Sequence, residues 1–481
     1  MTRPGDGAVP GAAAPASTPS VYETARLVAL APWLGGDAAR INFLMAAQER
    51  DGSWGGAQGA YAWVPTLSAV DALLSAADRG WPCAAEAAAA GLRYLAMRAP
   101  RGALPDTVAA ELLVPSLRES LGQRVGVDLA LPHGIDPVMH RRTAERVRRR
   151  GSIPGKLLHS YESIAPYCPP LGTHLGGGNS LVGSSPAATA AWIAASGGPS
   201  RNLPLVRRLE ASTAEHGGGP VSCPTPISTF ERLWIRYAEE GAGQLQDRSQ
   251  AATELASLLG PDGVSGAPGL APDADDTATA IYLLARLGRP VDTQVLRRFE
   301  TPSHFACYLG EDTPSPSANA HVLEALGEAS PSDHTTRRKI SDWLSASQHP
   351  DGSWSDKWHA SPYYAVYCCA AALHRYGTGA TASAAVRQAL AWLRATQRED
   401  GSWGRWGGTA EETAYALLAL ARCGALQRRD AENARIRLLS NDMTATPPPL
   451  WHDKDLYCPT RVVDACIRAA QQLTGAEARL G

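Results

Sequence analysis

The sequence repeats one short motif, Q-x-x-D-G-S-W, at Gln48–Trp54, Gln348–Trp354 and Gln397–Trp403. The last two copies start 49 residues apart, and each of them follows a stretch of helical character. The Asp-Gly pair inside the motif favours a turn. Each copy therefore predicts a helix, a turn, a tryptophan and a further helix, and repetition with this long period is typical of stacked helical hairpins.

A second repeat marks the starts of helices. An acidic residue followed by Thr-Ala stands at Glu23, Asp276 and Glu412. The two later copies continue as apolar helices that end at Gly288 and Gly424, as the helix dipole and the preference for a C-terminal glycine favour. Strand patterns are nearly absent, so we predict an all-α protein. Helical hairpins that close into rings form double α-helical (α/α) barrels.

The spacing of these copies predicts the domain organisation. The copy at Glu23 lies far from the other two along the chain. We therefore predict a barrel whose first helix lies within residues 21–34, an inserted second barrel at 35–243, and the rest of the first barrel at 244–481. Residues 1–20 are rich in Ala, Gly, Pro, Ser and Thr, which predicts a disordered tail.

Length and composition exclude several classes of function. At roughly 150 residues per domain, 481 residues suffice for two to four domains. A net charge of -2 offers no excess of cations for nucleic acid. We predict no transmembrane segment, because no apolar run approaches about 18 residues, and no signal peptide. Nine cysteines without a C-x-x-C pair predict a cytoplasmic protein; a homo-oligomer is compatible with this composition.

The sharpest candidate site is the acidic cluster Asp273-Ala-Asp275-Asp276-Thr277. One interpretation is purely structural, with Asp273 capping a helix that begins after Pro272. The other is chemical, because three carboxyl groups this close cannot all ionise cheaply and at least one proton is held. A D-D-x-x-D magnesium site, which would ionise a prenyl diphosphate, needs an acidic residue where the chain has Thr279.

The acidic cluster resembles the D-x-D-D-T motif of class II terpene cyclases, and the Q-x-x-D-G-S-W segments resemble the Gln-Trp repeats of that superfamily. Further segments are similar to bacterial diterpene cyclases and run in order along nearly the whole chain: Leu158–Glu162, Ser184–Ala190, Phe230–Trp234, Ser315–Asn319, Lys357–Tyr364 and Glu411–Tyr415. The resemblance implies the two-barrel βγ arrangement, without a diphosphate-ionising α domain.

The resemblance also implies a mechanism. The middle carboxyl, Asp275, would protonate the terminal alkene of an isoprenoid diphosphate, with Asp273 and Asp276 as its neighbours. Successive double bonds would then capture the cation and close rings while the diphosphate stays attached. Trp and Tyr faces stabilise desolvated cations by up to about 2 kcal/mol each. The chain has 13 Trp and only 4 Phe, and some of these indoles would stabilise cations in the substrate cavity. Most of them are expected in core or turn packing.

Other residues receive roles through the same resemblance. Ser315 and Asn319, four residues apart on one helix face, would hydrogen-bond the catalytic acid; a capped helix start after Pro316 is the structural alternative. Four residues would bind the substrate, the two lysines among them as compact charges for its diphosphate, although solvated ion pairs are as consistent with these lysines. The four are Lys357, Lys454, Trp358 and Tyr363.

Two further assignments concern metal binding and the end of the reaction. Asp106 and Glu111 match a D-x-x-x-x-E pattern proposed to hold Mg²⁺ in bacterial relatives, a spacing that is common in helices for other reasons. Oxygen ligands suit this ion. His159 is a candidate for the base that ends the reaction. In some plant relatives this histidine pairs with an asparagine, and here Cys223 stands in its place.

We therefore predict an enzyme that cyclises geranylgeranyl diphosphate to a bicyclic diterpenyl diphosphate, labdane-type or rearranged, with Mg²⁺ as cofactor. One alternative is the same chemistry on farnesyl diphosphate, giving drimenyl diphosphate. The other is a non-catalytic helical-barrel scaffold. A squalene cyclase would normally carry more Gln-Trp repeats, and a protein prenyltransferase relative would need an Asp/Cys/His zinc set that the sequence does not offer.

Overall fold

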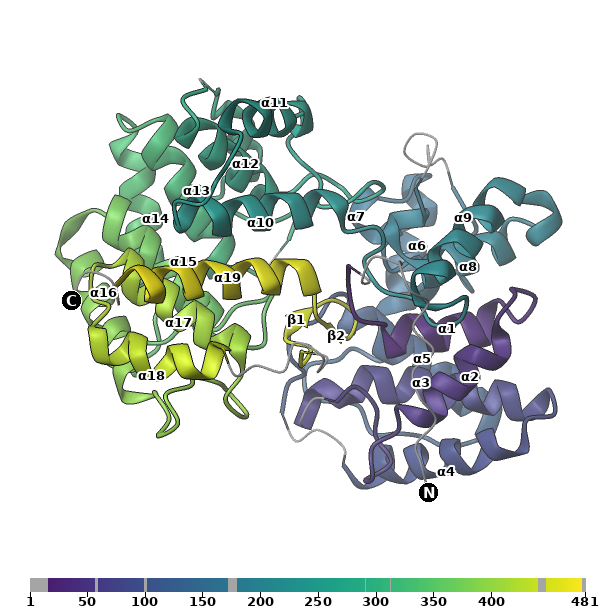
Figure 1. Cartoon of the computed structure of the whole chain (residues 1–481). Helices are drawn as coiled ribbons and strands as arrows, with labels where there is room; N and C mark the ends of the chain where they lie inside the picture. The colour runs from purple at the N-terminus through teal and green to yellow at the C-terminus, as the bar shows by residue number, and fades with distance from the viewer. Residues whose placement is uncertain are drawn as a thin grey trace.

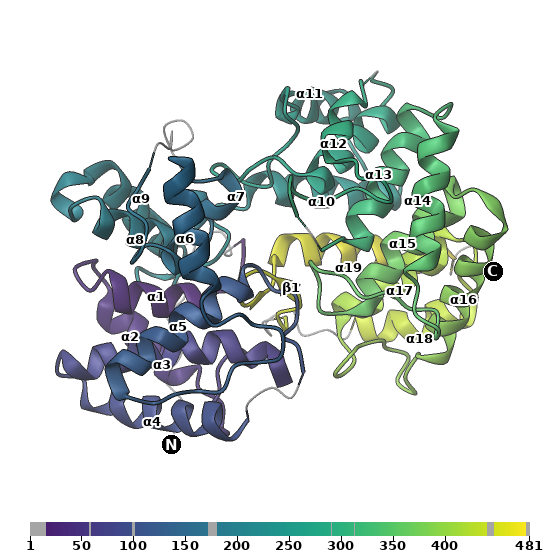
Figure 2. The ribbon, with the colours of Figure 1, turned by 180° about the vertical axis from the view of Figure 1, so that it is seen from behind.

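The computed structural model describes residues 16–56, 59–98, 102–171, 180–289, 291–311, 313–439 and 447–477. These residues are mostly helical and form two lobes that lie side by side, with a short hairpin between them (Figures 1 and 2). None of the described helices is both long and apolar enough to cross a membrane.

The N-terminal lobe holds α-helices and short 3-10 helices. The α-helices are α1 (Val21–Leu30), α2 (Asp37–Ala46), α3 (Trp63–Asp78), α4 (Pro82–Met97), α5 (Ala110–Val125), α6 (Met139–Arg150), α7 (Gly155–Leu158), α8 (Pro186–Ala195) and α9 (Leu203–Thr213). The 3-10 helices are η1 (Gly59–Ala62), η2 (Tyr161–Ser163), η3 (Val182–Ser184), η4 (Pro199–Arg201) and η5 (Ala214–His216).

This lobe is a ring of helices that closes on itself. α1 packs against α3, α3 against α5, α5 against η2, η2 against α8, and α8 against α1. α2 and α4 pack on the outside of α3, and α9 packs on α8. The short η2 thus takes the place that a full helix would have in a regular ring.

The C-terminal lobe begins at α10. Its elements are α10 (Ser228–Gly241), α11 (Arg248–Leu258), α12 (Ala274–Arg286), η6 (Gln294–Phe299), α13 (Pro316–Ala329), α14 (His334–Ala346), α15 (Pro362–Tyr376), α16 (Gly379–Ala395), α17 (Ala410–Arg422), α18 (Arg428–Leu439), β1 (Trp451–His452), β2 (Leu456–Tyr457) and α19 (Thr460–Glu477). The two strands pair antiparallel and form the hairpin between the lobes.

The C-terminal lobe is a more regular ring. α10, α12, α13, α15, α17 and α19 each pack against the next, and α19 packs back against α10. α11, α14, α16 and α18 lie outside this ring, each against an inner helix. The prediction of an all-α fold built from two α/α barrels is confirmed.

The assignment of the first helix differs from the prediction. We predicted that residues 21–34 complete the C-terminal barrel, but α1 packs against α2, α3 and α8, and its Tyr22 and Ala25 belong to the core of the N-terminal lobe. The lobe boundary also differs from the predicted 243, because α10 already packs on α12 and α19. The described lobes therefore follow one another along the chain.

The threonine of each Thr-Ala copy makes the same kind of hydrogen bond, which explains why this repeat did not distinguish the two barrels. The Thr24 hydroxyl accepts from the Val221 backbone N–H at 3.1 Å, and the Thr277 hydroxyl accepts from the Val264 N–H at 2.8 Å. Thr413 accepts from a backbone N–H in the same way. Each threonine ties the start of an inner helix to a distant or preceding loop, so the motif marks an inner helix in either lobe.

The predicted N-terminal tail lies partly outside the described residues, which begin at residue 16. The part that is described is held in place. The Thr18 N–H donates to the Cys458 carbonyl at 3.1 Å, and the Ser20 N–H donates to the Val221 carbonyl at 2.8 Å. Residues 16–20 therefore connect both lobes and are not a free tail.

The three Q-x-x-D-G-S-W segments form nearly identical turns. In the last one, the Gln397 amide donates to the Gly401 carbonyl at 3.1 Å, and the Trp403 indole N–H donates to the Leu393 carbonyl at 2.7 Å. Gly401 has φ of 79°, in the left-handed region that favours glycine. The motif tryptophans Trp54, Trp354 and Trp403 are fully buried, so they pack the turns and do not line a substrate site.

We expect Trp403→Phe to lower the free energy of unfolding by about 1–3 kcal/mol, because it leaves the buried Leu393 carbonyl without its donor. Urea unfolding followed by circular dichroism measures the change. Trp33→Phe is the matched control, since that indole is 38% exposed and should be close to neutral. Equal stabilities of the two variants would contradict a structural role for the motif tryptophan.

Candidate active site

The acidic cluster begins α12, and its first member caps the helix as predicted. Oδ1 of Asp273 accepts from the Asp276 backbone N–H at 2.8 Å. All three carboxyl-bearing residues are buried, Asp275 being 7% exposed. The structural and the chemical interpretations of the cluster are therefore compatible: the cap fixes the position of the helix start, and this places Asp275 in the interior.

Burial changes the protonation of the two neighbouring carboxyl groups. It raises the pKa of Asp273 to about 7. Burial, followed by the charge of Asp273, raises the pKa of Asp276 well above its usual range. Oδ1 of Asp276 is buried and has no hydrogen-bond partner within the described structure. Burial thus favours the protonated forms of Asp273 and Asp276.

Asp275 has one close partner, His321 on α13, which sequence reasoning missed. Oδ1 of Asp275 lies 2.6 Å from Nδ1 of His321. Although burial lowers the pKa of His321, the Asp275 carboxylate outweighs burial and raises it. Trp234 and Tyr237 meet the imidazole edge-on, with ring centroids 5.5 and 5.2 Å away. The available signal was the single histidine of α13, two residues after Asn319 of the motif.

The predicted partners of Asp275 have other roles. The Asn319 side chain accepts from the Phe305 N–H at 2.8 Å and donates to the carbonyls of Phe305 and Ser315. Ser315 caps α13 and donates to Asp356 at 3.0 Å. The prediction that they hydrogen-bond Asp275 is therefore wrong for this structure: their polar groups are used to fix the start of α13 and the loop beside it.

Aromatic side chains from several inner helices gather near this acid. The Trp234 indole donates to the Tyr364 hydroxyl at 3.0 Å, and Tyr364 also contacts Trp451 and Tyr415. The prediction had assigned substrate binding to Tyr363. This side chain instead packs on Trp392 of the outer helix α16, with ring centroids 4.8 Å apart. Adjacent helix residues point about 100° apart, which explains why Tyr364 takes the inner position.

A cationic group lies where the lobes meet. Nζ of Lys357 is 2.5 Å from Glu311 and 3.9 Å from Asp106. Lys156 of the N-terminal lobe binds the same Glu311 at 2.8 Å, a contact that the sequence did not predict. Trp358 lies beside Lys357, with 5.2 Å from Nζ to its ring centroid. Two lysines thus share one buried carboxylate, and the Asp106 carboxylate lies beside Lys357.

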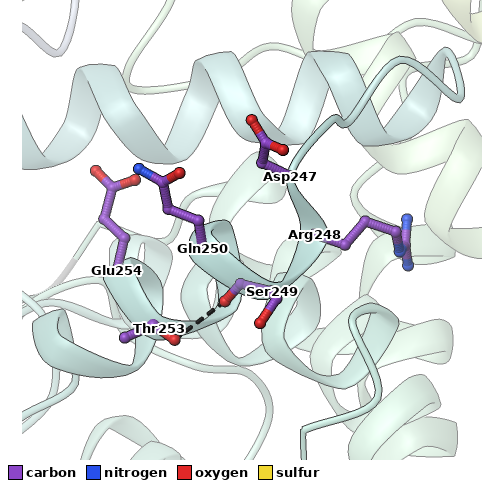
Figure 3. A pocket seen from close by; sticks show the side chains of 6 residues that line it. All are labelled: Asp247, Arg248, Ser249, Gln250, Thr253 and Glu254. Carbon is purple, nitrogen blue, oxygen red and sulfur yellow. Dashed lines mark hydrogen bonds between the residues drawn. The ribbon is translucent and has the colours of Figure 1, made fainter.

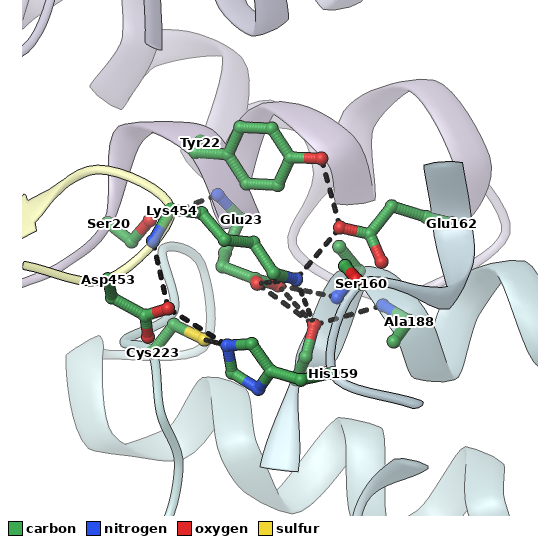
Figure 4. A network of polar contacts seen from close by, with 12 residues as sticks. Ser20, Tyr22, Glu23, His159, Ser160, Glu162, Ala188, Cys223, Asp453 and Lys454 are labelled. Carbon is green, nitrogen blue, oxygen red and sulfur yellow. Dashed lines mark hydrogen bonds and ion pairs between the residues drawn. The ribbon is translucent and has the colours of Figure 1, made fainter. Parts of the chain in front are cut away.

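Lys454, by contrast, is closed off from any ligand. Its ammonium group is fully buried and binds Glu23 at 2.7 Å, Glu162 at 2.8 Å and Ser185 at 2.8 Å (Figure 4). Although burial lowers the pKa of Lys454, the charges of Glu162 and Glu23 outweigh burial and raise it. The prediction that this lysine binds a diphosphate is wrong, because two carboxylates already satisfy its charge.

His159 lies in the same network, beside Asp453 of the hairpin (Figure 4). Its Nε2 is 2.8 Å from Oδ1 of Asp453, and its Nδ1 is 2.6 Å from the Gly183 carbonyl oxygen. Sγ of Cys223 lies 3.8 Å from the same Nε2. The cysteine that replaces the asparagine of plant relatives therefore does contact this histidine.

Comparisons with known proteins agree with the resemblance. Residues 306–457 match the squalene-hopene cyclase C-terminal domain. The chain is 44% identical to ent-copalyl diphosphate synthase of Streptomyces sp. (strain KO-3988), over 96% of this chain and 94% of that relative. It is 43% identical to labda-7,13-dienyl diphosphate synthase of Streptomyces clavuligerus, over 94% of this chain and 88% of that relative.

A solved structure matches just as extensively. The ent-copalyl diphosphate synthase from Streptomyces platensis superposes with a TM-score of 0.86 at 41% identity, over 95% of this chain and 96% of that one. The chain belongs to the class II terpene cyclases. Within them it is an enzyme of the bacterial diterpene cyclase type.

The predicted Mg²⁺ ligands of the cyclase occupy accessible positions. Asp106 is partly exposed, and Glu111 is exposed in the first turn of α5. Burial raises the pKa of Asp106, while Lys357 opposes this effect. Asp106, which solvent reaches and which lies beside Lys357, has the oxygen ligands that suit Mg²⁺, an ion that retains waters and takes few protein ligands. Glu111 is an exposed carboxylate at the start of the following helix.

A surface pocket of the cyclase has no part in this chemistry. It lies on α11 and the residues before it, and its lining is polar (Figure 3). The lining residues are Asp247, Arg248, Ser249, Gln250, Thr253 and Glu254. None of the candidate site residues lines it, so we assign the active site by the acidic cluster and not by this pocket.

The two lysines should respond differently to neutralisation. We expect Lys454→Met to lower the free energy of unfolding by about 3–5 kcal/mol, because Glu23 and Glu162 lose their buried cation. Lys357→Met should lower the free energy of unfolding much less, because Lys156 still pairs with Glu311. Its main effect should be a raised KM. Urea unfolding and steady-state kinetics of both variants measure this contrast. A raised KM in a stably folded Lys454→Met variant would contradict it.

Proposed function

We propose that the cyclase converts geranylgeranyl diphosphate into a bicyclic diterpenyl diphosphate, labdane-type or rearranged, and that the diphosphate is retained. The observation that carries this proposal is the buried acid of α12, which faces a partner histidine and an aromatic interior. Relatives named as copalyl and labdadienyl diphosphate synthases support the twenty-carbon substrate. The two lysines around Glu311 would bind the diphosphate group.

Asp275 would start the reaction. In this proposal Nδ1–H of His321 donates to Oδ1 of Asp275, and Asp275 carries its own proton on Oδ2. This proton transfers to the terminal alkene, and the carbon left cationic is attacked by the next double bond in turn, so that two rings form. His321, 2.6 Å away, stabilises the carboxylate that this transfer leaves. The aromatic faces of Trp234, Tyr364 and Trp451 stabilise positive charge without offering a nucleophile. Loss of a proton then forms the final alkene.

Mg²⁺ is part of this proposal, with Asp106 and Glu111 as its ligands. When bound, the ion would supply charge that holds the diphosphate. Lys357, beside Asp106, would contact the same group, and Trp358 has a buried indole N–H without a partner in the described structure that could donate to it. We place the reaction in the cytoplasm, where all nine cysteines, which are free in this structure, would remain reduced.

Farnesyl diphosphate is the second candidate substrate, and product analysis separates the two. Purified protein with Mg²⁺ and either substrate is analysed before and after dephosphorylation by mass spectrometry and NMR. We expect a cyclic product that still carries its diphosphate, formed faster from the twenty-carbon substrate. A free hydrocarbon released together with inorganic diphosphate, or no cyclic product at all, would contradict the proposal.

In the same assay, Asp275→Asn should lose nearly all turnover at every substrate concentration, because an amide has no carboxyl proton to give. Its fold should be retained, since Asp273 still caps α12. Asp262→Asn is the matched control, because that carboxylate lies on the surface and its variant should keep wild-type rates. Near-normal turnover in folded Asp275→Asn would remove it as the proton donor.

Asp106→Ala and Glu111→Ala should raise KM and shift the Mg²⁺ optimum upward, with residual turnover and an unchanged main product. The reason is that a diphosphate-binding ion positions the distant alkene but does not supply the proton. Rates measured across a Mg²⁺ titration check this expectation. If both variants keep the wild-type KM and Mg²⁺ dependence, these residues are ordinary surface carboxylates.

A further inference from the structure

We infer that Asp453, and not His159, accepts the proton whose loss ends the cyclisation. This inference rests on the proposed function, because it names the group that completes the same reaction. Asp453 is a hairpin residue that no sequence motif had marked as catalytic. Its side chain is buried between the lobes, beside His159 and Cys223 (Figure 4).

His159 has no free nitrogen with which to accept a proton. The Gly183 carbonyl oxygen, 2.6 Å from Nδ1, can only accept, so Nδ1 carries a hydrogen. Nε2 lies 2.8 Å from Oδ1 of Asp453 and donates to it if that carboxylate is charged. The charges agree with this arrangement: burial alone would lower the pKa of His159, but Asp453 raises it. The pair is an imidazolium and a carboxylate.

The two oxygens of Asp453 have different surroundings. Oδ1 accepts from His159 and also from the Lys454 backbone N–H at 2.8 Å. Oδ2 is buried and has no N–H or O–H partner within the described structure, and the Cys223 thiol, a weak donor, is the polar group beside the carboxylate. A buried carboxylate oxygen without a donor is costly, and such groups in native proteins call for an explanation. A cationic substrate beside Oδ2 would supply the missing partner.

The position of Asp453 relative to the acid supports this role. Burial, followed by the charge of Asp453, raises the pKa of Tyr457, and the charges of Cys223 and Asp276 add to the effect. Tyr457 therefore lies within electrostatic reach of both the acidic cluster and the Asp453 group. Trp451, two residues before Asp453 on the hairpin, packs on Tyr364 of the aromatic interior, with ring centroids 4.8 Å apart. In the inference, a substrate protonated by Asp275 extends past these rings toward Asp453.

The proposed step balances. A C–H bond next to the cationic ring carbon breaks, its electron pair becomes the new π bond, and the proton binds Oδ2 of Asp453. The cation and the carboxylate charge disappear together. Burial raises the pKa of Asp453, but His159 and Lys454 outweigh it and lower the pKa. This weak basicity is no obstacle, because a proton next to a carbocation is so acidic that the position of the base matters more than its strength.

A metal site is the competing interpretation of the same residues. Ligand atoms of His159, Cys223 and Asp453 all lie within 4.8 Å of one another. However, 2.8 Å between Nε2 and Oδ1 is a hydrogen-bond length, and burial raises the pKa of the Cys223 thiol well above its usual range. A neutral thiol and a hydrogen-bonded ion pair favour proton transfer over metal binding.

The test compares product mixtures. Asp453→Asn keeps an oxygen for His159 but removes the base, and we expect the share of the main alkene to fall about 100-fold. Products of water capture or of proton loss from another carbon should replace it, with KM unchanged. Asp262→Asn is the control, because that carboxylate lies on the surface, and its variant should keep the wild-type product.

His159→Gln provides an independent arm if Asp453→Asn does not fold. It retains a donor for Asp453, so the main alkene should persist at a reduced rate. A product switch in His159→Gln, an unchanged mixture in folded Asp453→Asn, or one tightly bound zinc per chain by elemental analysis would each overturn the inference. Failure of the proposed function would show differently, as a wild-type reaction without any cyclic diphosphate.

Discussion

The buried ammonium group of Lys454 joins the two lobes, and the active site depends on it. Removing an ion from water costs several kcal/mol, which only close partners of opposite charge offset. Its partners Glu23 and Glu162 belong to the N-terminal lobe, while Lys454 belongs to the hairpin that precedes α19. On either side of it, Asp453 binds His159 and Asp455 binds Ser20. Three consecutive charged residues thus fix the relative position of the lobes.

Because the lobes are fixed in this way, a complete site forms only at their junction. The proposed proton donor Asp275 belongs to α12, inside the C-terminal ring. Lys156 from one lobe and Lys357 from the other share Glu311, and the proposed base Asp453 is held by His159 from the N-terminal lobe. The C-terminal lobe supplies Asp275, Lys357 and Asp453, and the N-terminal lobe supplies Lys156 and His159, which hold Glu311 and Asp453 in place, so docking of the lobes completes the proposed site.

The sequence predicted what local rules control and missed what distant contacts control. The all-α fold, the Gln-Trp turns and the cap at Asp273 follow from turn and capping chemistry within a few residues. The role of Lys454 could not be predicted, because its partner Glu23 lies 431 positions away in the chain. The partner of Asp275 was missed for the same reason. The motif at Ser315–Asn319 marked the correct helix, but His321 meets Asp275 in place of Asn319, because the partner depends on how α12 and α13 pack.

The acid cluster shows how burial overcomes the helix dipole. A helix start favours carboxylates by about 1 kcal/mol or less, which would oppose the storage of protons at Asp273 and Asp276. Burial nevertheless raises the pKa of both residues, to about 7 for Asp273 and well above its usual range for Asp276. These shifts favour the protonated forms of both neighbours, which lowers the negative charge around Asp275, and His321 lies 2.6 Å from the Asp275 carboxyl group. The neighbours therefore limit the charge of the cluster, and His321 of α13 provides the hydrogen-bonding partner of Asp275.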